Sequence, residues 1–240
     1  MRGMEPEISV LSIALGLFSG PPRRRGIFTM RNVFAAVFFC LLCVLAAAAD
    51  PCPGTVILQN QFAAPNPNWS TAADTTSKPA LQNGQYVVTF LTQNTTRSVL
   101  YQGDVYGDIN LCVTLSTPAT DKAIDQVAGL VFWATDYTSY YAVMINPTSG
   151  QWEVTHLAGG RWLTPSPYQP STAIKTGVGA SNAVQVQLRG TTATIFINGT
   201  QVGTVSGNAP TGGGLVGFFA QSASTALSTW QFSDFSLSKP

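Results

Sequence analysis

The chain has 240 residues, which is enough for one substantial hydrophobic core and leaves little room for a second. Charged residues make up only 10% of the sequence and the formal net charge is +1, so the chain offers no basic face that could neutralise phosphates. These numbers predict a single folded domain and exclude nucleic acid as an expected partner.

The first 49 residues are interpreted as a leader. Residues 30–32 form a short basic start, residues 33–45 are apolar, and four alanines follow at 46–49. This is the three-part pattern of a secretory signal peptide, with Met30 interpreted as the true start and cleavage before Asp50. It predicts a secreted or periplasmic protein with the mature domain at 50–240 and no transmembrane segment after cleavage. An uncleaved membrane anchor is the alternative, but the apolar run is slightly short for a spanning helix.

Two cysteines, Cys52 and Cys112, remain after removal of the leader. A pair of cysteines in an oxidising compartment favours a disulfide over two free thiols. Such a bond would fasten the mature N-terminus to a central strand. Closing a loop of that length contributes on the order of 3–4 kcal/mol in the chain-entropy treatment.

From Thr55 onward the apolar residues alternate with a period of two, and no window carries a helical stripe. Two strands are the clearest. The first places Ile109, Leu111, Val113 and Leu115 on a buried face, and the second places Val184, Val186 and Leu188 on a buried face. The intervening residues of both strands are expected to face solvent. Further strands are expected at residues 55–59, 85–91, 98–101, 129–134, 140–145, 152–157, 193–197, 214–220 and 229–237. Residues 163–179 are rich in proline and glycine without an obvious strand pattern, and a loop is expected there.

Turn residues separate these strands. Asn198–Gly199 supplies the positive φ angles of a tight hairpin, and Gly159–Gly160 marks another turn. About eleven short strands with such turns predict an all-β protein, a two-sheet antiparallel jelly-roll sandwich closed by pairing of the first and last strands.

The order of motifs resembles the concanavalin A-like lectin/glucanase superfamily, which includes laminin G-like domains, family 16 glycosidases and 3-keto-disaccharide hydrolase domains. The residues that carry the resemblance are Gln61, Phe62, Trp69, 129–136 (GLVFWATD), Tyr140, Tyr141, Trp152, 160–162 (GRW), 195–199 (IFING), 213–218 (GGLVGF) and 230–235 (WQFSDF). The resemblance implies the sandwich fold, while binding and catalytic proteins share that architecture.

The family 16 catalytic motif is missing. Glycosidases of that family carry two glutamates and an aspartate on one strand, whereas Glu153 is the single glutamate after the leader. A retaining mechanism needs two carboxyls about 5 Å apart. The sequence therefore leans away from an enzyme, although the resemblance to 3-keto-disaccharide hydrolases keeps hydrolysis as an alternative.

Few polar residues are candidates for catalysis or metal binding. His156 is the only histidine and alternates away from Glu153, so a groove-lining or surface role is favoured over general-base catalysis. Asp121, Asp125 and Asp136 could contribute to a structural calcium site, but turn aspartates that accept backbone N–H bonds are the favoured interpretation. No other cofactor is expected.

Aromatic residues gather between positions 133 and 162. Aromatic rings stack on sugars and their polar tips donate hydrogen bonds, although sandwich cores are also rich in aromatics. The candidate ligand-binding residues are Trp133, Tyr137, Tyr141, Trp152, His156, Arg161 and Trp162. Of these, Trp162 beside Arg161 at a turn is the strongest candidate for an exposed ring.

The sequence is compatible with three functions. The favoured one is an exported carbohydrate-binding or interaction module, whose partner is a glycan or another component of the cell envelope. The alternatives are a hydrolase or lyase acting on modified disaccharides, and a structural envelope protein without a small ligand. An exposed aromatic cluster in one concavity favours the first, and converging carboxylates favour the second.

Overall fold

The computed structural model describes residues 52–118 and 126–240, which lie in the compact unit from Ala48 to Pro240. The predicted leader and the aspartates at 121 and 125 lie outside the described residues. Within that part of the chain the regular structure is entirely strand. The strands are β1 (Thr55–Asn60), β2 (Ser77–Gln82), β3 (Gln85–Phe90), β4 (Thr96–Leu100), β5 (Asn110–Ser116), β6 (Val127–Asp136), β7 (Ser139–Asn146), β8 (Gln151–Ala158), β9 (Arg161–Pro170), β10 (Asn182–Arg189), β11 (Thr192–Ile197), β12 (Thr200–Ser206), β13 (Leu215–Gln221) and β14 (Thr229–Lys239).

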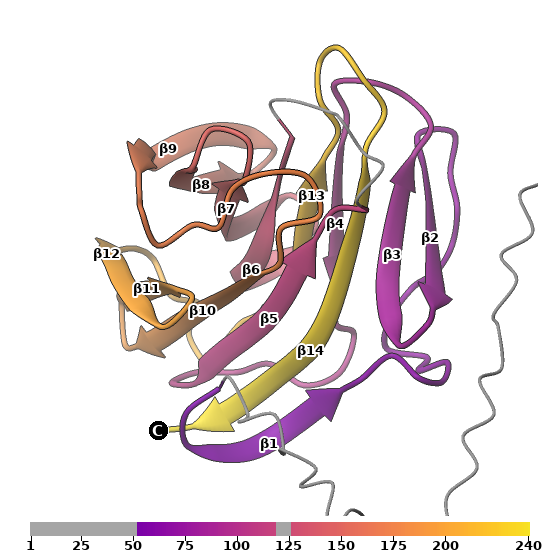
Figure 1. Ribbon diagram of the computed structural model, residues 1–240. Helices are drawn as coiled ribbons and strands as arrows, with labels where there is room; N and C mark the ends of the chain where they lie inside the picture. Colours follow the sequence, from indigo (N-terminus) through magenta and orange to yellow (C-terminus); the bar gives the residue numbers. More distant parts are fainter. Residues whose placement is uncertain (1–51, 119–125) are drawn as a thin grey trace, which may run out of the picture. The chain divides into compact units, whose positions relative to one another are not determined.

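The strands form two antiparallel sheets, as the sequence predicts (Figure 1). The larger sheet has the order β12-β11-β10-β5-β14-β3-β2, and the six-stranded sheet has the order β4-β13-β6-β7-β8-β9. The long strand β14 pairs with β3 through its first half and with β1 through its second half. The predicted pairing of the first and last strands is therefore confirmed, and β6 to β9 form a continuous meander.

Three strands were not predicted, namely β2, β9 and β12, and the expected loop at 163–179 is wrong up to Pro170. Proline lacks an N–H and is tolerated mainly where a strand has a free edge. Pro79 lies in β2 and Pro165 and Pro167 lie in β9, and both strands are at the edge of their sheet. Register shifts between β8 and β9 also interrupt the alternation that marks a strand in the sequence.

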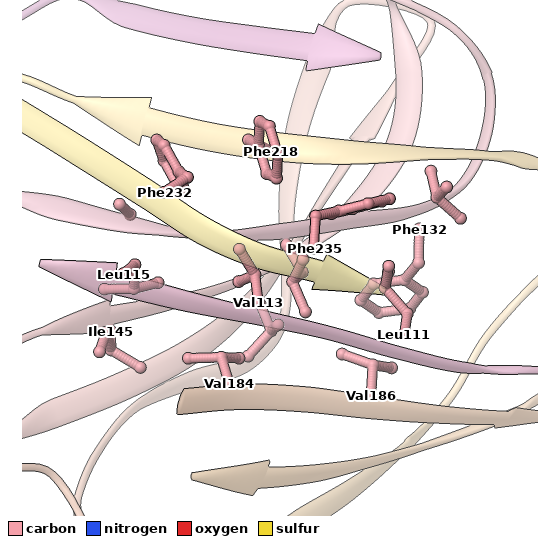
Figure 2. Close-up of a cluster of buried hydrophobic side chains, with 14 of the residues drawn as sticks. Leu111, Val113, Leu115, Phe132, Ile145, Val184, Val186, Phe218, Phe232 and Phe235 are labelled. Carbon is pink, nitrogen blue, oxygen red and sulfur yellow. The ribbon is translucent and has the colours of Figure 1, made fainter. Parts of the chain in front are cut away.

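The apolar faces of the predicted strands meet between the sheets (Figure 2). Leu111, Val113 and Leu115 of β5 and Val184 and Val186 of β10 are buried in this core, as expected. Side chains from the six-stranded sheet complete it, including Phe132, Ile145 and Phe218. The strand alternation read from the sequence thus identifies the inner faces correctly.

The outer face of β5 is drier than predicted. Cys112 and Asn110 were expected on a wet face, but both are buried. Cys52 forms a disulfide with Cys112, and the Asn110 amide donates hydrogen bonds to the Pro53 carbonyl and the Ser238 hydroxyl. The segment leading into β1 therefore covers this part of the sheet, and the predicted disulfide is confirmed.

Within the described parts of the chain, no helix has the length and hydropathy that crossing a bilayer requires.

Candidate functional site

The outer face of the six-stranded sheet carries the candidate site. Strand register places one row of residues across this face: Ser98 on β4, Phe219 on β13, Gly129 on β6, Met144 on β7 and Glu153 on β8. Their chain neighbours Phe218 and Val143 point into the core between the sheets. Because side chains alternate along a strand, this row lies on the opposite face.

This outer face is curled into a concave surface. Trp162 lies on edge strand β9 and Phe219 on β13, with three strands between them. A flat sheet would separate these two strands by about 19 Å, since neighbouring strands lie about 4.8 Å apart. The ring centroids of Trp162 and Phe219 are nevertheless only 6.0 Å apart. The sheet therefore bends over its outer face so that edge strand β9 approaches β13.

The floor of the concave surface is filled by apolar side chains. A second buried cluster lies there, separate from the main core, and consists of Leu100, Val127, Val131, Ala134, Tyr140, Ala142, Met144, Leu157 and Phe219. Burial of these side chains leaves the rim, and not the floor, available to a ligand.

Two exposed aromatic rings lie on this rim. Tyr137 is 48% exposed and Trp162 is 46% exposed. The Tyr140 ring contacts Trp162 edge-on at 6.0 Å, and the Ser98 side chain lies near the Tyr140 hydroxyl, where it counters the burial that raises the pKa of Tyr140. Ser98 and Tyr137 both line a hollow of about 280 Å³. We refer to Tyr137, Ser98, Tyr140 and Trp162 as the rim platform.

An ion pair fixes the wall of the hollow beside the rim platform. Arg97 pairs with Asp74 and also donates to the Ala72 carbonyl at 2.9 Å. Hydrogen bonds from Thr76 and Ser77, aided by the Arg97 guanidinium, hold the pKa of Asp74 at about 2. Arg97 is thus held by the protein itself and supplies a rigid polar wall.

Three of the predicted ligand-binding aromatics are buried. Trp133 and Tyr141 pack perpendicular to each other at 5.3 Å in the main core, and the Tyr141 hydroxyl accepts a hydrogen bond from the Asn208 N–H. Trp152 is also buried, on the inner face of β8. Their rings contribute to packing and do not face the rim platform.

His156 is stacked on Tyr141, with ring centroids 3.9 Å apart. Partial burial lowers the pKa of His156, which favours the neutral imidazole. Glu153 lies on the opposite face of β8, as the alternation predicted, so the two side chains do not form a catalytic pair. Arg161 is exposed beside Trp162 at the start of β9.

Glu153 is a half-buried carboxyl on the concave face. Burial raises the pKa of Glu153, and a hydrogen bond from the Tyr168 hydroxyl partly offsets this effect. Tyr168, on β9, is itself exposed. Glu153 is therefore easier to protonate in the folded protein than in the unfolded chain.

This raised pKa has a consequence for stability. Ionisation of Glu153 is less favourable in the folded state, so its contribution to stability falls as pH rises above the ordinary glutamate value of 4.5. We expect Glu153→Gln to melt at a higher temperature than wild type at pH 7, with the difference shrinking at pH 3. Thermal melts at the two pH values test this, and an equal difference at both would contradict it.

Asp136 acts in a turn. The Asp136 carboxylate accepts hydrogen bonds from the N–H and the hydroxyl of Thr138, and these bonds lower the pKa of Asp136. Across residues 52–118 and 126–240, no three His, Cys, Asp or Glu side chains are grouped so as to hold a metal ion. Asp121 and Asp125 lie outside these ranges.

Sequence reasoning missed Arg97, Ser98 and Tyr168 as parts of this surface. Arg97 and Ser98 lie on β4, far before Tyr137 in the chain, and reach it only because the sheet curls. Tyr168 lies within the segment that was expected to be a loop. The prolines of this segment are unfavourable in most strands, so the sequence pattern carried no signal for a strand there.

No protein-family model matches the chain, and no curated protein matches it in sequence. Solved structures do match its fold. A carbohydrate-binding module, CBM66 from Bacillus subtilis, aligns with a TM-score of 0.57 and 11% identity over 72% of this chain and 96% of its own. A Bacillus licheniformis beta-glucanase aligns with a TM-score of 0.56 and 10% identity over 78% of this chain and 99% of its own.

A third match is a Bacillus subtilis protein of unknown function with a galectin-like fold, with a TM-score of 0.55 and 11% identity over 78% of this chain and 96% of its own. What these structures share with the chain is the fold, a two-sheet antiparallel jelly-roll sandwich. At these identities the likeness concerns architecture, and function has to be argued from the site.

Proposed function

We propose that this protein is an exported, non-catalytic carbohydrate-binding module whose ligand lies on the rim platform. The observation that carries the proposal is the pair of exposed rings, Tyr137 and Trp162, on one concave surface, where Tyr140 packs against Trp162 and Ser98 lines a hollow with Tyr137. A glycan, free or part of the cell envelope, is the proposed partner.

The chemistry of the rim platform suits a sugar. An exposed aromatic face packs against the C–H face of a pyranose ring, and nearby polar groups fix its orientation. Trp162 is braced edge-on by both Tyr140 and Phe219, so its ring is held before a ligand arrives. The hollow beside Tyr137 adds the polar side chains of Thr96, Ser98 and Arg97.

Two further observations support the proposal. The sandwich resembles a carbohydrate-binding module and a beta-glucanase over most of its length. A disulfide between Cys52 and Cys112 is typical of proteins in oxidising compartments, which agrees with export. Secretion and location in the cell envelope are parts of this proposal.

A glycan array followed by titration of the best ligand tests the site. We expect Trp162→Ala and Tyr137→Ala each to weaken binding about tenfold, which corresponds to about 1.4 kcal/mol, because each removes a stacking ring. Leu227→Ala is the matched control, since Leu227 is a comparably exposed apolar side chain in the loop between β13 and β14.

Circular dichroism should show that all three variants remain folded. An affinity unchanged by both ring substitutions would remove the rim platform as the site. If the array also gave no ligand, a structural envelope protein would become the better description.

One observation favours the hydrolase alternative, namely a carboxyl of raised pKa on the concave face, Glu153. Double-displacement hydrolysis requires a second carboxyl about 5 Å away. Strands β6 to β9 carry one other described carboxyl, Asp136, which is engaged by Thr138 in a turn. Incubation with a 3-keto-disaccharide discriminates the two functions: turnover by wild type that is abolished in Glu153→Gln would establish an enzyme.

A further inference from the structure

A second concavity lies at the open edge of the sandwich, where edge strand β9 of one sheet faces edge strand β12 of the other. This groove encloses about 800 Å³. It is formed by the end of β9, the start of β12, the β7–β8 turn and residues 171–174 and 176. Trp162 and Gln169 lie at opposite ends of β9, about 23 Å apart along an extended strand, so the groove is separate from the rim platform.

The loop that forms the wall of the groove is fastened on both sides. On one side the Ser171 N–H donates to the Gly150 carbonyl and the Gly177 N–H donates to the Pro147 carbonyl. On the other side the Asn198 amide donates to the Ala173 carbonyl at 2.7 Å, and Asn182 exchanges two hydrogen bonds with the Lys175 backbone. The groove is therefore preformed, and a ligand would not have to order this loop.

Trp152 forms the floor of the groove. Its ring rests on β12 at Gly203, where the Cβ of any larger residue would lie 2.4 Å from Cη2 of the indole, so a glycine is required at this position. Trp152 is almost completely buried, yet its indole forms no hydrogen bond with any other described residue. The indole N–H is thus a donor without a protein partner at the base of a concavity.

The remaining lining is uncharged and combines polar side chains with four apolar residues, Pro170, Ala173, Ile174 and Val202. Thr172, Thr176, Thr200 and Gln201 are exposed around the groove, and none of the lining residues is ionisable. Hydroxyl and amide groups around an aromatic floor match the alternating hydroxyl and C–H surfaces of a neutral sugar. An anionic ligand would find no cation among the lining residues, and an apolar ligand would leave these polar groups unpaired.

We propose that this groove is a second binding site, specific for neutral, extended oligosaccharides. It does not depend on the rim platform, so the two sites can be tested in one titration. Residues of both sheets line it, and its open shape between two edge strands suits a chain of several sugar units.

The experiment follows indole N–H resonances in the folded, ¹⁵N-labelled mature protein by two-dimensional NMR. Trp152 reports on the groove and Trp162 on the rim platform. Trp230, whose indole donates to the Gln221 carbonyl, serves as an internal control. Trp→Phe variants assign the signals. The probes are cellohexaose, laminarihexaose, xylohexaose and mannohexaose, with tetragalacturonate as the charged comparison.

We expect at least one neutral hexasaccharide to shift the Trp152 signal saturably, and tetragalacturonate to leave it unchanged. Gln201→Ala should weaken that interaction roughly five- to tenfold through loss of a hydrogen-bonding side chain. Thr172→Trp should abolish it by filling the groove. Gln187→Ala, a substitution of the same type on β10, should have no effect.

The outcomes separate the two proposals. If a neutral probe shifts the Trp162 signal and no neutral probe shifts the Trp152 signal, the groove proposal is wrong and the rim platform is supported. If a neutral probe shifts only the Trp152 signal, the groove is supported as a binding site and the rim platform is not. If neither signal moves at millimolar probe, the groove proposal is wrong for these sugars and the carbohydrate-binding function loses its main support.

Discussion

Phe218→Ala is expected to lower the free energy of unfolding by about 3–5 kcal/mol, the usual cost of truncating a fully buried phenylalanine. Phe218 points from β13 into the core (Figure 2) and is 1% exposed. Its ring is stacked on Trp69 at 4.6 Å and on Phe232 at 4.6 Å, and Phe235 packs edge-on against it at 5.2 Å. Removal of this ring leaves a cavity that none of its rigid aromatic neighbours can fill.

Equilibrium unfolding in guanidinium chloride measures this effect as a lower transition midpoint with an unchanged slope. Val178→Ala, at an exposed position in the loop before β10, is the control and should change stability by less than about 0.5 kcal/mol. A loss below about 1 kcal/mol for Phe218→Ala would show that the two sheets are not packed through this ring.

Removal of the disulfide should have the second largest effect. The bond joins Cys52 to Cys112 across 60 residues, and closing a loop of this length stabilises the folded state by about 3–4 kcal/mol through the entropy of the unfolded chain. The double variant Cys52→Ala/Cys112→Ala is expected to lose this amount. The loss should also increase hydrogen exchange in β1, since β14 is the one described strand that pairs with it and β1 begins shortly after Cys52.

Wild-type protein treated with a reductant provides the matched comparison, because it keeps both sulfur atoms in place. Its stability should fall to that of the double variant within about 1 kcal/mol, which is the usual cost of small packing changes. Detection of two reactive thiols in the denatured, unreduced protein would contradict the bond itself.

Much of the fold follows from the sequence, because successive side chains of a strand point to opposite faces. This rule is local, and it correctly placed Val113 and Val186 in the core and Glu153 and His156 on opposite faces of β8. The two cysteines beyond the predicted leader were sufficient to predict their bond. The rule failed where edge strands broke the alternation, as in β9, whose prolines and register shifts hide a strand.

The candidate sites were decided by tertiary structure. The sequence predicted that aromatics between 133 and 162 would gather near a ligand, but a strand pattern cannot say which outer face is covered. Curling of the six-stranded sheet brought Trp162 to Phe219 and Tyr140 to Ser98, while packing against the second sheet buried Tyr141 and Trp152. Curvature depends on how all six strands twist and pack together, so no single segment of the sequence encodes it.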